Sequence, residues 1–104
     1  MSFTEAPFRD AVADLMLERG WSQRDLAAAV GVDPAHISRL LRRGSSLRAT
    51  PQLLARVARA LELEPEFFVE YREWCVIEAI RRNPSLRERL FARVVAPEQQ
   101  LSGP

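Results

Sequence analysis

Apolar residues along most of the chain recur at intervals of three and four, the spacing that places them on one face of an α-helix. Two clear groups flank Gly31, with Leu26, Ala27 and Val30 before it and Ile37, Leu40 and Leu41 after it. Glycine adopts the left-handed conformation that ends many helices. The pattern therefore predicts two short helices within residues 23–42, joined by a tight turn.

Capping residues mark the starts of these helices. Ser22 precedes the first and Asp33 the second, and side chains of both types accept hydrogen bonds from the N–H groups of a first helical turn. Pro34 stands at the first position of the second helix, where its missing N–H does no harm. Ala27 is small enough to lie where two helices cross steeply. Val32 can fill the corner between them.

The same spacing predicts a helix on either side of this pair. The earlier one starts near Ala6, with Thr4 as its cap, and the later one starts at Thr50-Pro51. Trp21 precedes a cap, where an apolar residue packs on the first turn, so we interpret it as a core residue rather than a DNA-stacking one. The predicted buried residues are Phe8, Val12, Leu15 and Met16, then Leu53, Leu54, Val57, Ala58 and Leu61.

The segment that starts at Pro65 is apolar on two sides. Phe68, Tyr71, Cys75 and Ala79 form one stripe, and Val69, Val76 and Ile80 lie nearly opposite. A helix apolar on two sides is buried on two sides, so one side can cover the preceding helices and the other needs a partner. Asn83 and Pro84 start a last helix with Leu86, Leu90, Phe91 and Val94 on one face.

A second copy of the chain can supply that partner, because a two-fold dimer buries the same surface of both copies. The alternative is that the last helix folds back and covers the apolar side within one chain. The dimer prediction places these residues at the contact: Val69, Trp74, Val76, Ile80 and Phe91.

The paired helices resemble the helix-turn-helix of Cro and the phage repressors, the XRE family. The residues that carry the resemblance are Gln23, Leu26-Ala27, Gly31-Val32 and Ile37-Ser38, followed by Arg39. It extends over roughly residues 8–63. Where the family often closes with Glu-x-Gly, this chain has Leu-Arg-Arg-Gly at 41–44, which predicts a recognition helix one residue longer.

The resemblance implies an all-α fold: a five- to six-helix lambda-repressor-like DNA-binding domain with C-terminal dimerisation helices. We expect this domain over residues 6–64, a helical extension for dimerisation over 65–96 and a flexible tail over 97–104. No convincing strand pattern interrupts the chain.

The family also implies roles for individual residues on and near the second motif helix. Base edges are read by Ala35, Ser38 and Arg39, with Arg39 donating two hydrogen bonds to guanine and Ala35 touching a thymine methyl. Phosphates are contacted by Gln23, His36, Arg42, Arg43 and Arg48. Arg42 and Arg43 have a second interpretation, because cations are favoured at any helix C-terminus.

Charge is uneven along the 104 residues, although the formal net charge is only +1. Six arginines and no acid lie between Pro34 and Ala60, whereas six arginines face eight glutamates from Leu61 onward. The basic residues therefore concentrate on and after the second motif helix, as expected of a nucleic-acid-binding surface. All fifteen basic residues are arginine.

Residues for catalysis or metal binding are not evident. The single His36 and single Cys75 stand far apart, with no Gly-rich phosphate loop, no HExxH and no pair of CxxC motifs. We expect no enzyme activity, no cofactor and no metal site, and we interpret Cys75 as a small core residue. One cysteine excludes an internal disulfide and fits a reducing cytoplasm. No signal peptide and no membrane-spanning run are predicted.

The sequence thus predicts a cytoplasmic, sequence-specific transcriptional regulator, a repressor, found at the nucleoid when it binds a short palindromic operator as a homodimer. Its partners are double-stranded DNA and a second copy, with a regulatory protein partner left open. The alternative is a protein-interaction module or antitoxin that uses the same fold. Asp33 is the only acid in or beside the recognition helix, and its role as a cap favours DNA.

Overall fold

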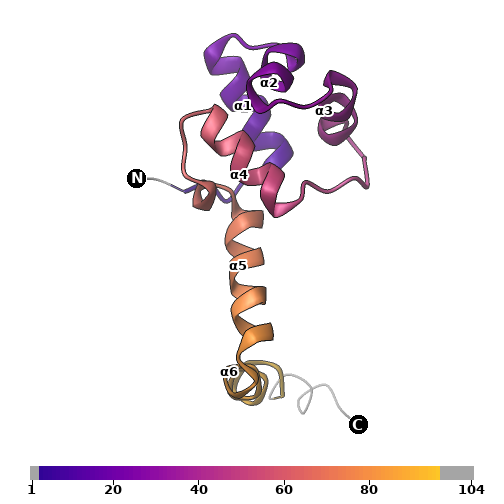
Figure 1. The fold of residues 1–104 in the computed structure, drawn as a ribbon. Coiled ribbons are helices and arrows are strands. Elements are labelled where there is room, and N and C mark those ends of the chain that lie inside the picture. Colours follow the sequence, from indigo (N-terminus) through magenta and orange to yellow (C-terminus); the bar gives the residue numbers. More distant parts are fainter. Residues whose placement is uncertain (1–2, 97–104) are drawn as a thin grey trace. The chain divides into compact units, whose positions relative to one another are not determined.

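The computed structural model describes residues 3–96, and within them every regular element is helical (Figure 1). The predicted all-α class is confirmed, and the predicted tail at 97–104 lies outside the described residues. The elements are α1 (Phe8–Arg19), α2 (Gln23–Val30), α3 (Pro34–Leu41), α4 (Pro51–Ala60), the 3-10 turn η1 (Pro65–Phe67), α5 (Val69–Arg82), α6 (Pro84–Leu90) and the π-helical turn η2 (Phe91–Val95).

The chain divides into two compact units, the first ending at Glu73 and the second starting at Trp74. Phe68 is fully buried in the core of the first unit, so the packing of that unit extends past residue 64. Functional roles for residues 6–64 and 65–96 stay a prediction.

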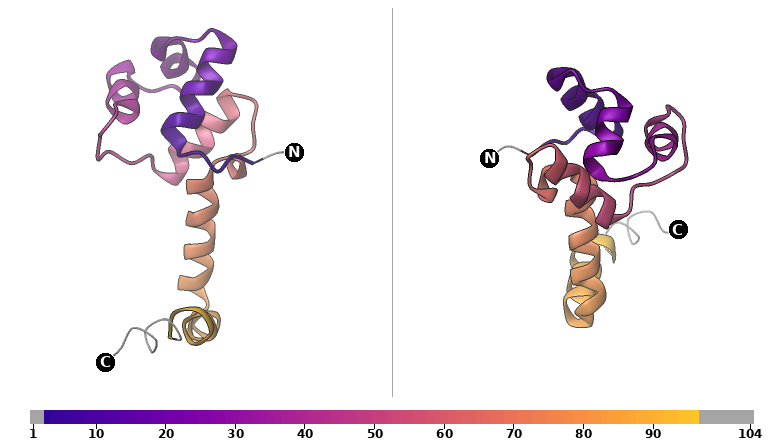
Figure 2. Two further views of the ribbon diagram at one scale, coloured as in Figure 1. Left: turned by 180° about the vertical axis from the view of Figure 1, so that it is seen from behind. Right: turned by 45° about the horizontal axis from the view of Figure 1, so that its top comes forward.

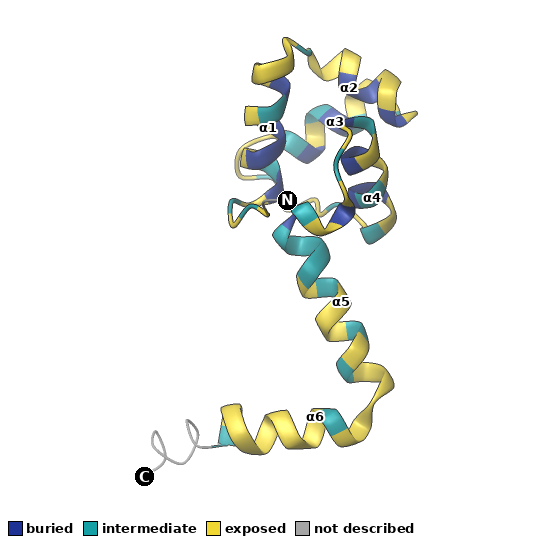
Figure 3. Ribbon diagram, turned by 90° about the vertical axis from the view of Figure 1, so that its left-hand side faces the viewer, coloured by how far each residue is buried: buried dark blue, intermediate teal, exposed yellow. Residues whose placement is uncertain are grey.

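The first unit is built around an apolar core to which α1, α2, α3 and α4 each contribute (Figure 3). The predicted helical stripes supply nearly all of it. Leu15 and Leu41, predicted as buried, lie at the edge of the core and are only partly covered, and Trp21 packs there as well. The fully packed set is Phe8, Ala11, Val12, Met16, Leu26, Ala27, Val30, Ile37, Leu40, Leu53, Leu54, Val57, Ala58, Leu61 and Phe68.

Hydrogen bonds from its own residues and from α4 hold the turn between α2 and α3. Gly31 has a φ of 84°, and its N–H and that of Val32 donate to the carbonyl of Ala27 at 2.8 and 3.0 Å. Arg56, on α4, donates from Nη2 to the carbonyl of Val30 at 2.6 Å and to that of Gly31 at 3.3 Å. A guanidinium is favoured at a helix C-terminus, where carbonyl groups lack intrahelical partners. Arg56 therefore fixes the point at which the chain turns into α3.

Most predicted caps are confirmed, and one is wrong. Ser22 forms a capping box with Asp25, and the side chains of Asp33, Thr50 and Asn83 accept hydrogen bonds from Ala35, Leu53 and Leu86 respectively. Thr4 does not cap α1. Its hydroxyl accepts from the N–H of Ala6, and the helix begins later, at Phe8.

The first turn of α1 is capped by a residue distant in sequence. The preceding residue, Pro7, has no side-chain acceptor, and a carboxylate oxygen of Glu70 accepts from the N–H of Phe8 at 2.6 Å. Arg72 donates to the carbonyl of Thr4 at 2.9 Å, and the rings of Phe8 and Phe68 meet edge to face with centroids 5.0 Å apart. The start of α5 therefore belongs structurally to the first unit.

Helix α3 ends at Leu41, because Arg42 is extended, with φ −65° and ψ 132°. That this helix is one residue longer than in the family stays a prediction. One further expectation is wrong. Cys75 is not a core residue. It is exposed, because the described core ends at Phe68 and no residue of α5 is buried.

The second unit contains the end of α5, then α6 and η2, and no residue of α6 or η2 is buried. Val76 is 58% exposed and Phe91 is 47% exposed. The last helix therefore leaves these side chains uncovered, in contrast to the fold-back alternative. The other large apolar side chains exposed in this unit are Ile77, Leu90, Val94 and Val95.

Substitution of Gly31 by alanine tests the turn. A Cβ at Gly31 would lie 3.0 Å from Nη2 of Arg56, in addition to the strain of a positive φ. Gly44→Ala is the matched control, because its φ of 81° is similar and nothing lies within 4 Å of its Cβ position. We expect Gly31→Ala to lower the free energy of unfolding in urea by about 2–3 kcal/mol and Gly44→Ala by about 1 kcal/mol. Equal losses would show that Arg56 adds no constraint.

Candidate nucleic-acid interface

Helix α3 has one face in the core and another in solvent. Ile37 and Leu40 are buried, whereas Ala35 and Arg39 are exposed and Ser38 is partly exposed. Asp33 accepts from the N–H of Ala35 at 2.9 Å, so this acid is engaged at the helix start. The exposed face therefore offers a methyl group, a hydroxyl and a guanidinium, three groups that can contact base edges in a major groove.

The connection from α3 to α4, residues 42–50, is a long loop that runs along the outside of the helices (Figure 2). Gly44 has a φ of 81°. The N–H of Ser45 donates to the carbonyl of Arg42 at 3.1 Å, and the Ser45 hydroxyl accepts from the N–H of Leu47 at 3.1 Å. These bonds give the loop a defined turn immediately after α3.

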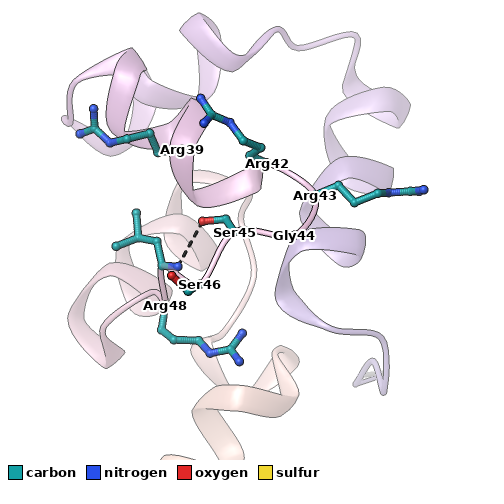
Figure 4. Close-up of a pocket in the computed structure, with 8 residues that line it drawn as sticks. Arg39, Arg42, Arg43, Gly44, Ser45, Ser46 and Arg48 are labelled. Carbon is teal, nitrogen blue, oxygen red and sulfur yellow. Dashed lines mark hydrogen bonds between the residues drawn. The ribbon is translucent and has the colours of Figure 1, made fainter.

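An open hollow of about 600 Å³ is lined by the end of α3 and by this loop. Figure 4 shows the arginine side chains around it extending away from the backbone. We call the four of them the arginine rim. The rim is Arg39, Arg42, Arg43 and Arg48.

The rim arginines are exposed, and none of their side chains makes a hydrogen bond or ion pair within the described chain. Their side chains extend in different directions from the end of α3 and the loop (Figure 4), and each guanidinium is available to a phosphate group. Arg56, which belongs to the same acid-free stretch, is different because its guanidinium is bound to the carbonyls at the end of α2. The structure thus separates arginines that charge alone could not distinguish.

The remaining predicted phosphate contacts are less uniform. Gln23 is exposed at the first position of α2, and His36 on α3 is partly exposed. The capping box already engages Ser22 and Asp25 at the start of α2. Arg24, to which the sequence analysis gave no role, is also exposed, beside Gln23.

The predicted dimerisation residues come from two elements. Val76 and Phe91 are exposed, whereas Val69, Trp74 and Ile80 are partly exposed. Ile77, which the sequence analysis did not include, is 45% exposed on the same helix as Val76.

The sequence model of the helix-turn-helix family matches residues 12–68, more than half of the chain. The chain belongs to the helix-turn-helix family of the XRE type. This confirms the resemblance and the lambda-repressor-like fold, with α2 and α3 as the two helices of the motif. Searches of curated proteins and of solved structures returned no match.

Membership makes this helix-turn-helix protein a DNA-binding regulator, since the family is a DNA-binding, non-enzymatic domain. Across residues 3–96, no three histidine, cysteine or acidic side chains gather where they could hold a metal. None of the described helices has the length and apolar character required to cross a membrane.

The distinction between Arg56 and the arginine rim predicts effects of different size on stability. Arg56→Met removes two hydrogen bonds from a charged donor and should lower the free energy of unfolding by about 1.5–3 kcal/mol. Arg48→Met is the matched control, and it should change that free energy by less than about 0.5 kcal/mol, as surface substitutions usually do. Urea unfolding of both variants measures these two changes in the free energy of unfolding. A stable Arg56→Met protein would return Arg56 to the candidate interface.

Proposed function

We propose that this helix-turn-helix protein is a transcriptional repressor that binds a short palindromic operator as a homodimer. The observation that carries the proposal is the arginine rim, whose guanidinium groups are exposed and unbound beside the solvent face of α3. It would act on chromosomal DNA, at the nucleoid of the cytoplasm. Occupation of an operator within a promoter would block transcription.

Base readout in this proposal comes from the solvent face of α3. In helix-turn-helix proteins the second helix lies in the major groove, and its N-terminal residues contact base edges. Arg39 donates two parallel hydrogen bonds to a guanine, and Ala35 contacts a thymine methyl group. The Ser38 hydroxyl can donate to or accept from the bases of either type of base pair. Pro34 contributes only shape. Three side chains can specify a half-site of a few base pairs.

Affinity comes mainly from phosphate contacts, which position the protein without reading sequence. The DNA phosphates are contacted beside the hollow by Arg42, Arg43 and Arg48. Further phosphates are contacted by Gln23 on α2 and by His36 on α3. Each neutralised phosphate releases condensed counterions and adds about −0.9 to the slope of log affinity against log salt. Binding should therefore weaken steeply as salt rises.

Dimerisation follows from the apolar side chains that α5 and η2 leave uncovered. Helices of 14 and 7 residues with no buried residue are marginal by themselves, and a second copy can bury Val69, Trp74, Val76, Ile80 and Phe91. Two recognition helices placed about 34 Å apart read a palindrome across one turn of DNA. Dimerisation thereby supplies the specificity that one helix lacks.

The alternative function is a protein-interaction module or antitoxin with a protein as its main partner. A surface of that kind often carries acids, but the solvent face of α3 carries none, and Asp33 is engaged as a cap. Selection of bound sequences from random DNA with the purified protein separates the two functions. Recovery of a palindrome supports the repressor. No enrichment of any sequence would contradict it.

Arg39 and Arg48 should differ in what their loss does to binding. Arg39→Ala should cost about 1–3 kcal/mol on the operator and relax base preference at one position, because a bidentate contact to guanine is lost. Arg48→Ala should weaken all sequences by a similar factor. Selection profiles of both variants, compared with wild type, provide the measurement. An unchanged Arg39→Ala profile would remove Arg39 from base readout.

Val76→Glu should convert the dimer into a folded monomer, because it places a charge in the proposed apolar contact. Leu17→Glu is the matched control: Leu17 is an apolar residue of α1 that is 83% exposed and lies outside the second unit. Sedimentation at micromolar concentration reports the mass of each protein, and circular dichroism reports helix content. A monomeric wild type, or a Val76→Glu protein that still dimerises, would rule out this contact.

A further inference from the structure

Arg9 links α1 to the loop that carries most of the arginine rim. Its Nη2 donates to the carbonyl of Ser45 at 3.2 Å, across 36 positions of sequence. Arg9 is partly buried, and its Nε is buried without a hydrogen-bond partner among the described residues. Arg9 itself does not line the hollow.

The loop makes few other hydrogen bonds, although Ala49 near its end packs against the core. Its own bonds are local, from Ser45 to Arg42 and from Leu47 to Ser45, and at its end Thr50 caps α4. Among residues 3–96, the only side chain of another element that donates a hydrogen bond to this loop is that of Arg9. The bond therefore ties the middle of the loop to the body of the first unit.

Stability alone does not explain this arginine. A buried guanidinium nitrogen without a hydrogen-bond partner is destabilising, and such groups in native structures call for a reason. An apolar side chain of similar length could cover the same surface without that cost. What arginine adds at this position is the hydrogen bond to the loop.

We propose that Arg9 is a positioning residue for DNA binding. It holds Arg42, Arg43 and Arg48 in the arrangement that phosphates require, without touching DNA. Ordering a loop and its long side chains at the moment of binding weakens affinity, and a loop that is ordered beforehand avoids that loss. This inference rests on the proposed DNA contacts of the arginine rim.

Two substitutions separate positioning from charge. Arg9→Met keeps the aliphatic length and loses the donors, whereas Arg9→Lys keeps the positive charge and loses the planar fork that reaches the carbonyl. The probes are the operator duplex selected with wild type and an unrelated duplex of equal length. We expect both variants to bind both duplexes roughly three- to tenfold more weakly, with base preference unchanged.

The salt dependence of DNA affinity distinguishes positioning from a direct contact between Arg9 and a phosphate. If Arg9 only positions the loop, the slope of log affinity against log salt stays at the wild-type value in Arg9→Met. If Arg9 bound a phosphate, the slope would become shallower by about 0.9. A shallower slope, or an Arg9→Lys protein with wild-type affinity, would overturn the proposal.

Hydrogen exchange tests the positioning without DNA. The amides of Ser45 and Leu47, which take part in the loop turn, should exchange faster in both Arg9 variants while those of α2 and α4 do not. Arg19→Met is the matched control, because Arg19 also donates to a backbone carbonyl, that of Leu61 at 2.6 Å, but away from the loop. It should leave loop exchange and DNA affinity unchanged.

The two proposals fail in different ways. A wild-type protein that selects no DNA contradicts the repressor, whereas unchanged loop exchange in Arg9→Met and Arg9→Lys contradicts the positioning role even if the wild type binds DNA tightly.

Discussion

The geometry of the DNA-binding unit depends on how α2 ends. Gly31 supplies the left-handed turn, and Arg56 binds the carbonyls that α2 leaves without partners. A hydrogen bond from a charged donor contributes about 1.5–3 kcal/mol, a large share of the stability of a small domain. Because Arg56 is on α4, this contact joins the fourth helix to the motif. It supports the turn from which α3 departs, while Ile37 and Leu40 hold the inner face of α3 in the core.

Arginine serves two purposes in this chain, and the environment of each guanidinium decides which. Arg9, Arg19 and Arg56 donate to main-chain carbonyls and connect segments distant in sequence. The arginine rim makes no such bond and remains available to an anionic partner. The side chain suits both tasks because its donors form a rigid planar fork and its charge is permanent. A protein without lysine can therefore divide one residue type between folding and binding.

Burial differs sharply between the two units. The first encloses an apolar core that includes the fully buried Phe68, whereas α6 and η2 of the second contain no buried residue. Removal of apolar surface from water is the main favourable term in folding, so the second unit gains little of it within one chain. Exposed side chains such as Val76 and Phe91 then have a physical reason to meet a partner. A dimer formed through them would present two recognition helices to one operator.

Local signals in the sequence were sufficient for the helices, for the motif and for the residues that line α3. Caps could be predicted at Ser22, Asp33 and Thr50, because a cap acts on the two or three residues that follow it. Core residues could be predicted because helical spacing is also a short-range pattern. Contacts between distant segments were beyond such signals. Glu70 caps α1 from 62 positions away, Arg56 binds the end of α2, and Cys75 lies in solvent although its stripe is apolar. Each of these depends on which surfaces meet when the helices pack, and periodicity along one helix carries no information about its neighbours.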